Sequence, residues 1–380
     1  MTETPPNLKR KKIMLSAIGG FVLLGAILFF YWLLYARFYE YTDDAYANGN
    51  KVVLTSQISG IVTSFTADDT DFVEKGRILV KLDTTDRQIA LDKSIADLGG
   101  MVREVSKLFE KVPEIAAKIE KNKAHLLQCS QDFDHREALI DEGAVSIEDL
   151  EHAIAALNEA FAELELSEHE YLAALSQIEN TTLEDHPLCM SSKERVKEAY
   201  VNLKRCTLLA PVSGIVAQRN VQVGKQITWG EPLLAIVPLE QMWVEANFKE
   251  VQLSGVRIGQ SAKVVSDLWG RDCIFHGTVV GIDGGTGSIF SVLPPQNATG
   301  NWIKIVQRLA VRIALDPQEL KSHPLRLGLS MEVTVDIHDQ DKKMIPPVKS
   351  EKALYETDVV SFQEEGVDAL ISQIISDNLL

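Results

Sequence analysis

The sequence has little of what a metal centre, a redox site or a catalytic centre requires. It contains 4 cysteines among 380 residues, and no two of them are spaced as in a Cys-x-x-Cys motif. The 8 histidines are scattered singly, without a His-Glu-x-x-His pair. We find no arrangement of a nucleophile with a base. The sequence therefore predicts no metal, no cofactor and no enzymatic activity, and it predicts unpaired, mostly buried thiols at Cys129, Cys189, Cys206 and Cys273.

Positive charge is also scarce. Lys and Arg number 38 against 54 Asp and Glu, which gives a formal net charge of -16. A nucleic-acid partner is therefore not expected, because binding phosphates requires clustered Lys and Arg. A hydrophobic content of 46% is ordinary for a folded protein, and the length suggests two or three folded units.

The one basic cluster, Lys9 to Lys12, precedes a long apolar run. No charged residue occurs from Ile13 to Tyr35, a run of 23 residues, and about 20 suffice to span a bilayer. A cleaved signal peptide is the alternative, but its apolar region is usually shorter, about 7–15 residues. We therefore expect an uncleaved transmembrane helix over residues 13–36. The basic residues place the tail 1–12 in the cytoplasm and the bulk of the chain in the periplasm of a bacterium, anchored in the inner membrane by a single pass.

A short motif, SGIV, occurs twice, and the likeness extends beyond four letters. In each copy a second glycine follows the first after 16 residues (76 − 60 and 230 − 214). Apolar residues alternate around both copies, as in strands. Each half is too short to be stable alone, so the two should close on each other in one small β-sandwich built from 50–83 and 208–238. The residues that define the repeat are Ser59, Gly60 and Gly76 in the first half and Ser213, Gly214 and Gly230 in the second.

If the two halves meet, the segment between them, 84–207, must leave and return as a hairpin. Its apolar residues recur in alternating steps of four and three, which is the heptad pattern of helices that wind around each other. Asp83 or Thr84 is a candidate N-cap for the first helix. Gly143 is expected to end that helix and Ser146 to cap the second, with the tip near 141–146. The second arm is predicted to present Leu150, Ile154, Leu157, Phe161, Leu164, Glu168, Tyr171, Leu175 and Ile178 to the first.

Helix-breaking residues occur at matching heights in the two arms. Gly99-Gly100 falls opposite His186-Pro187 when the arms are folded at Gly143. We therefore expect a joint in both arms there, with a shorter helical section, 85–98 beside 193–206, next to the sandwich.

The remaining residues read as strands and loops. Short alternating segments over 239–340 predict a small β-barrel. Within it, the glycine-rich GIDGGTGSIF lacks the Gly-Lys-Ser/Thr of a phosphate-binding loop, so we interpret it as a barrel loop. A second loop, which contains Asn297 and Trp302, is a candidate for packing or for partner contact. The last residues, 341–380, are expected to form one more strand and a short amphipathic helix. The predicted fold class is multidomain α+β.

The order of these parts, with the segments TDDAYANG, APVSGIV, WVEANFKEVQL and GTGSIFSVLPPQNATGNWIKIVQRLAVRI, resembles the HlyD family of membrane fusion proteins, and within it the EmrA-type adaptors of multidrug export. The resemblance implies a split lipoyl-like sandwich, an α-hairpin, a β-barrel and a membrane anchor, in a homo-oligomer. It also implies two partners: an inner-membrane transporter of the major facilitator class and a TolC-like outer-membrane channel. The channel contacts that it implies at the tip are Arg136, Leu139 or Ile140, and Ser146.

Other interpretations remain open. Arg136 could be a solvated charge, and Ser146 a simple helix cap. The adaptor could serve an ABC-driven type I secretion system, or the chain could be a structural tether in the cell envelope. A lipoyl or biotinyl carrier is a further class, but neither Lys81 nor Lys225 stands in a carrier motif, and the helical insertion occupies the carrier position.

Overall fold

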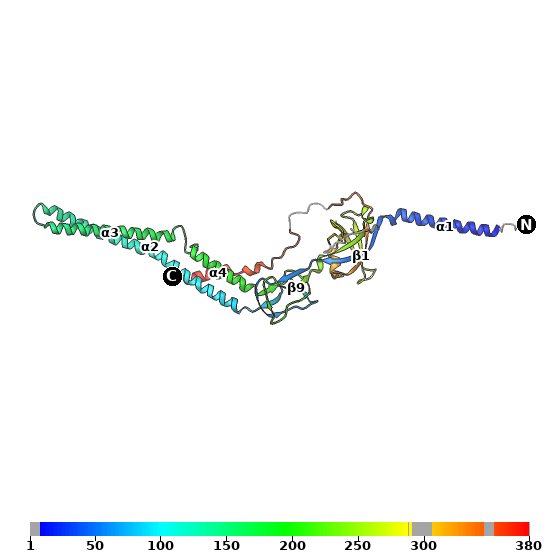
Figure 1. The fold of residues 1–380 in the computed structure, drawn as a ribbon, viewed down its shortest axis with the longest axis horizontal. Coiled ribbons are helices and arrows are strands. Elements are labelled where there is room, and N and C mark those ends of the chain that lie inside the picture. Colours follow the sequence, from blue (N-terminus) through cyan, green and yellow to red (C-terminus); the bar gives the residue numbers. More distant parts are fainter. Residues whose placement is uncertain (1–7, 288, 291–305, 346–352, 380) are drawn as a thin grey trace, which may run out of the picture.

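The protein is an elongated rod in which the predicted parts follow one another from end to end. The computed structural model describes residues 8–287, 289–290, 306–345 and 353–379. In Figure 1 an N-terminal helix lies at one end and a helical hairpin at the other, with a β-barrel and a β-sandwich between them. This arrangement confirms the predicted fold class.

The N-terminal helix α1 (Leu8–Leu34) has the length and composition of a membrane span. Apart from the half-buried Leu33, its apolar side chains from Ile13 to Leu34 are exposed, and the candidate span runs from Lys12 to Phe38. No other helix among the described residues is long and apolar enough to cross a bilayer. A short 3-10 turn, η1 (Ala36–Phe38), connects α1 to the first strand.

The barrel is closed by six antiparallel strands, and it takes one strand from an unexpected place. The strands, in barrel order, are β1 (Tyr39–Gly49), β10 (Met242–Lys249), β13 (Arg308–Leu315), β12 (Ile274–Ile282), β11 (Ser261–Ser266) and β14 (Ser330–Asp336). β1 pairs with both β10 and β14. The barrel therefore extends beyond the predicted residues 239–340, because a strand that precedes the sandwich closes it.

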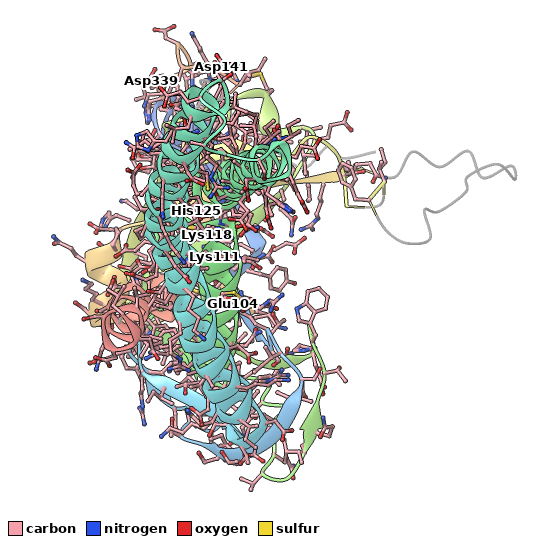
Figure 2. All side chains as sticks on the ribbon, turned by 90° about the vertical axis from the view of Figure 1, so that its left-hand side faces the viewer. Glu104, Lys111, Lys118, His125, Asp141 and Asp339 are labelled. Atoms are coloured by element: carbon pink, nitrogen blue, oxygen red, sulfur yellow. The ribbon has the colours of Figure 1, made fainter. Side chains whose placement is uncertain are left out.

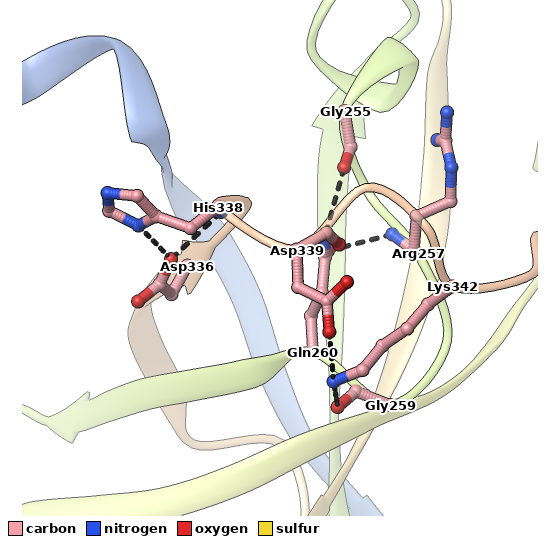
Figure 3. Close-up of polar contacts among 8 residues, drawn as sticks. All are labelled: Gly255, Arg257, Gly259, Gln260, Asp336, His338, Asp339 and Lys342. Carbon is pink, nitrogen blue, oxygen red and sulfur yellow. Dashed lines mark hydrogen bonds and ion pairs between the residues drawn. The ribbon is translucent and has the colours of Figure 1, made fainter.

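The barrel core is apolar on every strand, and buried polar groups hold the loops at its ends. Phe248, Phe275 and Ile313 are fully buried inside it. The buried amide of Gln260 donates to the carbonyl oxygens of Gly255 (3.0 Å) and Asp339 (2.8 Å), as Figure 3 shows. These bonds tie the chain that leaves β14 to the barrel.

Beyond the barrel, the two repeats form one sandwich of two four-stranded sheets. One sheet has the order β2 (Val52–Thr55), β9 (Pro232–Val237), β7 (Gly214–Ala217) and β4 (Phe72–Val73). The other has the order β6 (Thr207–Leu209), β5 (Ile78–Leu82), β3 (Gly60–Phe65) and β8 (Gln226–Ile227). Each sheet contains strands from both repeats, so the prediction that the distant halves close on each other is confirmed.

The hairpin consists of α2 (Thr85–Ile140), α3 (Ile147–Ile178) and α4 (Pro187–Lys204). The predicted joint is therefore present in the second arm and absent from the first, because α2 runs unbroken through Gly99-Gly100. The reason lies in packing: a Cβ on Gly99 would sit only 3.0 Å from Oδ1 of Asn378. Gly99 thus permits close approach of another helix. At the start of α2, Asp83 Oδ1 accepts from Thr85 N (3.0 Å), whereas the Thr84 side chain makes no capping bond.

That other helix is α6 (Val367–Asn378), which follows the 3-10 turn η4 (Ser361–Glu364). It packs against α2 and α4 through a shared apolar core. The strand expected in 341–380 is wrong over the described parts of that range, 341–345 and 353–379, which contain no strand. Instead, Asp358 pairs with Lys75 of the sandwich (2.8 Å), so the C-terminal segment returns along the sandwich to the hairpin. The core that α6 completes consists of Leu91, Leu98, Val102, Val105, Cys189, Val196, Val367, Ile371, Ile374 and Ile375.

The prediction of which residues form the seam between α2 and α3 is correct for α2 and only partly correct for α3. On α2 the row that follows the predicted steps of four and three is buried or half-buried throughout: Ile115, Ile119, Asn122, Leu126, Cys129, Phe133, Arg136 and Ile140. On α3 the large residues at 150, 157, 164, 171 and 178 are half-buried as predicted. However, small residues occupy the fully buried positions between them. The larger residues that were predicted for these positions lie beside the seam instead. The buried small residues are Ala153, Ala160, Ser167 and Ala174; of the larger predicted residues, Ile154, Phe161 and Glu168 are exposed and Leu175 is half-buried.

Candidate functional site

The end of the hairpin is a tight, self-capped turn. Gly143 adopts a left-handed conformation (φ +66°), which favours glycine and ends α2. Ser146 Oγ accepts from Asp149 N (3.1 Å) and donates to Asp149 Oδ2 (2.6 Å). The predicted cap is therefore confirmed. The hydrogen bond from Ser146 lowers the pKa of the Asp149 carboxyl. The tip is thus a fixed structure that can present side chains in set directions.

Arg136 holds the two arms together just behind this turn. Its guanidinium donates to the carbonyl oxygen of Asp149 across the hairpin (3.0 Å) and pairs with Asp132 on its own helix (2.9 Å). Arg136 is therefore a partly exposed charge at the edge of the seam that also links the two arms, and its contact with a channel stays a prediction. Arg136 and Ser146 both act on the first turn of α3, so a change at either residue alters the tip itself.

Apolar side chains project from the tip into solvent. Leu139 is 41% exposed, Ile140 is half-buried and Ile147 is 71% exposed. Ile147 was not among the predicted contacts, although it directly follows the Ser146 cap. A β-branched apolar residue at the first position of a surface helix is a signal that could have identified it.

The tip is also strongly acidic. Between residues 132 and 151, Arg136 is the only Lys or Arg, whereas eight positions hold Asp or Glu. The carboxylates are Asp132, Asp134, Glu137, Asp141, Glu142, Glu148, Asp149 and Glu151. A partner that binds here meets a few exposed apolar groups inside a negative field.

At the other end of the hairpin, in the sandwich, the two copies of the repeated motif form reciprocal hydrogen bonds with each other's half. Ser59 Oγ accepts from Trp229 N of the second half (3.2 Å), and Ser213 Oγ accepts from Lys75 N of the first (2.9 Å). Each serine thus stabilises the turn before the left-handed glycine of the other half, Gly230 or Gly76. The same exchange recurs in the backbone, since Gly230 N donates to Ser56 O and Gly76 N to Ala210 O, both at 2.8 Å.

The glycines of the repeat have different roles. Gly76 and Gly230 have φ values of +84° and +79°, which favour glycine. Gly214 is required for space, because a Cβ there would lie 2.4 Å from the carbonyl oxygen of Val237. Gly60, its counterpart, would place a Cβ at an ordinary 3.6 Å from Leu82.

The two lysines weighed for a carrier role have structural positions. Lys81 lies within β5, where its backbone pairs with Ser64 and Thr207. Lys225 forms an ion pair with Glu231 at 2.7 Å. The remaining predicted contact residues, Asn297 and Trp302, lie outside the described residues.

Comparison with known proteins places the chain among multidrug export proteins. Residues 85–206 match the family described as EMRA, alpha-helical hairpin domain. The probable multidrug resistance protein EmrK of Escherichia coli K12 is 42% identical over 373 residues, which cover 97% of this chain and 96% of EmrK. The multidrug export protein EmrA of Haemophilus influenzae is 39% identical, over 97% of this chain and 95% of that protein.

A solved structure of the periplasmic adaptor protein EmrA matches 79% of this chain and 99% of its own, with 23% identity and a TM-score of 0.40. The whole-length identities to EmrK and EmrA and the matching hairpin lead to one conclusion. The chain belongs to the EmrA-type membrane fusion proteins.

Proposed function

We propose that the chain is the periplasmic adaptor of a tripartite multidrug efflux pump. In this pump, α1 anchors the protein in the inner membrane with residues 1–12 in the cytoplasm, beside a transporter of the major facilitator class. The barrel and sandwich form a collar in a homo-oligomer, and the hairpin reaches a TolC-like outer-membrane channel. The observation that carries the proposal is the continuous rod, which has a membrane span at one end and an exposed apolar tip at the other.

The dimensions support a bridging role. α2 alone has 56 residues, which at about 1.5 Å per residue is roughly 84 Å of unbroken helix. Its partner arm and α6 support it from the sides. A rod of this length is suited to holding two membrane proteins at a fixed separation.

The first experiment tests the pathway. A strain that lacks the gene should become sensitive to drugs, and the full chain should restore resistance. Membrane purification of the tagged chain should recover an inner-membrane transporter. Recovery of an ABC transporter together with lost protein secretion would favour type I secretion instead. Unchanged drug sensitivity and unchanged secretion would favour an envelope tether.

The second experiment tests the tip. Arg136→Asp should weaken channel docking, but it also breaks the bond to the Asp149 carbonyl. Ile147→Asp is the sharper variant, because Ile147 is 71% exposed and an acidic residue suits a helix N-terminus. Ile89→Asp is the matched control, since Ile89 is 61% exposed at the far end of α2. We expect Ile147→Asp to lose crosslinking to the channel while Ile89→Asp retains it. Equal crosslinking of both variants would contradict the assignment of the tip.

A further inference from the structure

A polar cavity lies where the membrane span meets the barrel. It has a volume of about 580 Å³, and it is formed by the turn η1 on one side and by the chain that leaves β14 on the other. Only one of its lining side chains is apolar, so the cavity suits a polar ligand better than an acyl chain. The lining residues are Arg37, Phe38, His338, Asp339, Gln340 and Asp341.

Ring stacking and hydrogen bonds fix the walls of this cavity. The His338 ring stacks on Phe38, with the ring centroids 4.2 Å apart, and its Nδ1 lies 2.5 Å from Asp336 Oδ1. The buried Gln260 holds the following turn through the carbonyl oxygen of Asp339 (Figure 3). The cavity is therefore formed without a ligand, as most small-molecule sites are.

Two opposite charges in the cavity lack an ion-pair partner. The Arg37 guanidinium lies over the Phe38 ring, 4.5 Å from its centroid, and within the described residues neither Arg37 nor Asp341 forms an ion pair. The neighbouring carboxylate of Asp339 is already paired with Lys342 at 3.3 Å. The cavity thus presents one cation and one anion that do not bind each other.

Unpaired charges are ordinary on a surface that faces water. Glu104 and Lys111 of α2, for example, are exposed, and neither forms an ion pair with another described residue (Figure 2). Arg37 has different surroundings, because a single residue separates it from the uncharged run 13–35. Its surroundings are therefore those of a residue at the end of a membrane span.

The cavity lies at the level of the lipid headgroups. The exposed rings of Tyr31, Trp32 and Tyr35 directly precede it, and such rings favour the interface between bilayer and water. A basic residue at the end of a span extends its charge toward the headgroups. The molecules closest to Arg37 in a membrane are therefore lipid headgroups.

The two charges decide which headgroup fits. A phosphate alone would be attracted by Arg37 and repelled by Asp341, and a cation alone would experience the reverse. A group that carries both a phosphate and a primary ammonium satisfies both residues. A guanidinium binds phosphate oxygens, and an ammonium donates hydrogen bonds to a carboxylate.

We propose that this cavity binds the phosphoethanolamine headgroup of a bilayer lipid, with the phosphate on Arg37 and the ammonium on Asp341. The inference rests on one part of the proposed function, the anchoring of the chain by α1. It requires no step of drug export.

Lipid binding to the full chain tests the site. The protein is purified in detergent, freed of lipid and titrated with phosphatidylethanolamine, phosphatidylcholine or phosphatidylglycerol of identical acyl chains, and native mass spectrometry measures the fraction of chains that hold lipid. Phosphatidylcholine has the same charges but no N–H on its ammonium, and phosphatidylglycerol has a phosphate without a cation. The variants are Arg37→Gln and Asp341→Asn. Their matched controls are Arg271→Gln and Asp272→Asn, which change exposed charges between β11 and β12 at the opposite end of the barrel.

We expect the unmodified chain to bind phosphatidylethanolamine roughly three- to tenfold more tightly than either other lipid. Asp341→Asn should remove this preference without lowering the binding of phosphatidylglycerol, because asparagine keeps the shape but not the charge. Arg37→Gln should lower the binding of all three lipids, since all three contain the phosphate. Both control variants should bind lipid as the unmodified chain does.

Equal binding of the three lipids by the unmodified chain would overturn the proposal, because it would reflect only the lipid that surrounds α1. A preference for phosphatidylethanolamine that survives in Asp341→Asn would overturn it too. If both variants keep the preference but no longer recover the transporter from membranes, the two charges serve a protein partner and the headgroup assignment is wrong. Flotation of each variant with vesicles measures anchoring by α1, and drug resistance in the same strains measures the adaptor function. Failure of either is thereby distinguished from failure of this site.

Discussion

Gly60 and Gly214, the glycines of the two SGIV motifs, should respond oppositely to substitution by alanine. Gly214→Ala places a methyl group 2.4 Å from the Val237 carbonyl oxygen and 2.7 Å from its carbon. Both atoms belong to the backbone of β9, so no side chain can turn away to make room. Gly60→Ala places its methyl group at 3.6 Å from Leu82, a normal contact.

The magnitudes follow from these distances. Overpacking of this kind destabilises by about 1–3 kcal/mol, and a forced backbone shift lies at the upper end. Gly60→Ala lacks the clash, and it restricts the unfolded chain, which stabilises by about 0.4–1 kcal/mol where the conformation is compatible. The two variants should therefore differ by roughly 1.5–4 kcal/mol in the free energy of opening the sandwich.

The buried thiol of Cys206 provides the assay. It lies in the sandwich core at 1% exposure, so it reacts only when the sandwich opens. With the other three cysteines replaced by serine, the labelling rate under mildly denaturing conditions reports that opening. Gly214→Ala should label about tenfold or more faster than Gly60→Ala, since about 1.4 kcal/mol corresponds to a factor of ten. Equal labelling rates would refute the claim that close approach to β9, rather than the motif as such, requires glycine at position 214.

Three further predictions use the same protein. Ser59→Ala and Ser213→Ala should each weaken the sandwich by about 0.5–1.5 kcal/mol, and clearly unequal Cys206 labelling would contradict the reciprocal bonding of the two halves. Ile374→Ala should cost about 2–5 kcal/mol in the core that α6 completes, which would speed labelling of the buried Cys189 and leave Cys206 labelling unchanged. At the tip, the Ser146 hydrogen bond lowers the pKa of Asp149, so its stabilisation is complete above the unfolded value, about 3.9, and is lost as the pH falls through the folded pKa. Amide exchange over 141–150, corrected for the intrinsic rate, should rise on acidification in the native protein, and an identical rise in Ser146→Ala would count against this cause.

The sandwich and the outline of the hairpin could be predicted because local pattern and tertiary structure agree there. The doubled SGIV motif, the alternating apolar residues and the Gly143 and Ser146 signals all point to the same structure. The barrel strand β1 gives a weaker signal, because the residues that it buries are small or polar, such as Thr42, Ala45 and Ala47. A strand of this composition becomes evident only through its pairing with β10 and β14.

The joint at Gly99-Gly100 shows where local reasoning fails. Each glycine costs a helix about 1 kcal/mol relative to alanine, which favours a break. The break does not form, because α6 packs on this section of α2 and Asn378 occupies the space that a side chain on Gly99 would need. The decisive contact comes from a segment almost 280 positions later, which a local pattern does not include.

The rotation of α3 has a related origin. Two rows of residues compete for the seam, and both contain Leu150, Leu157 and Leu164. Hydrophobicity favours the row with Ile154 and Phe161, but close packing of facing helices favours alternation of large and small side chains. Close packing decides the arrangement, because small residues occupy the buried positions of α3. The larger residues Ile154 and Phe161 are consequently left exposed beside the seam.

The number of chain connections between neighbouring parts of the rod supports its role as a fixed spacer. Barrel and sandwich are joined by two passes, between β1 and β2 and between β9 and β10, and sandwich and hairpin by two more, before α2 and after α4. The C-terminal segment adds further contacts with the sandwich and the hairpin through Asp358 and α6. Two passes of the chain therefore restrain rotation at each junction, and the C-terminal contacts restrain it further between sandwich and hairpin. The membrane helix, by contrast, joins the barrel through the single pass from Leu34 to Tyr39. We therefore expect the anchor to tilt relative to the barrel more easily than the parts of the rod tilt relative to one another.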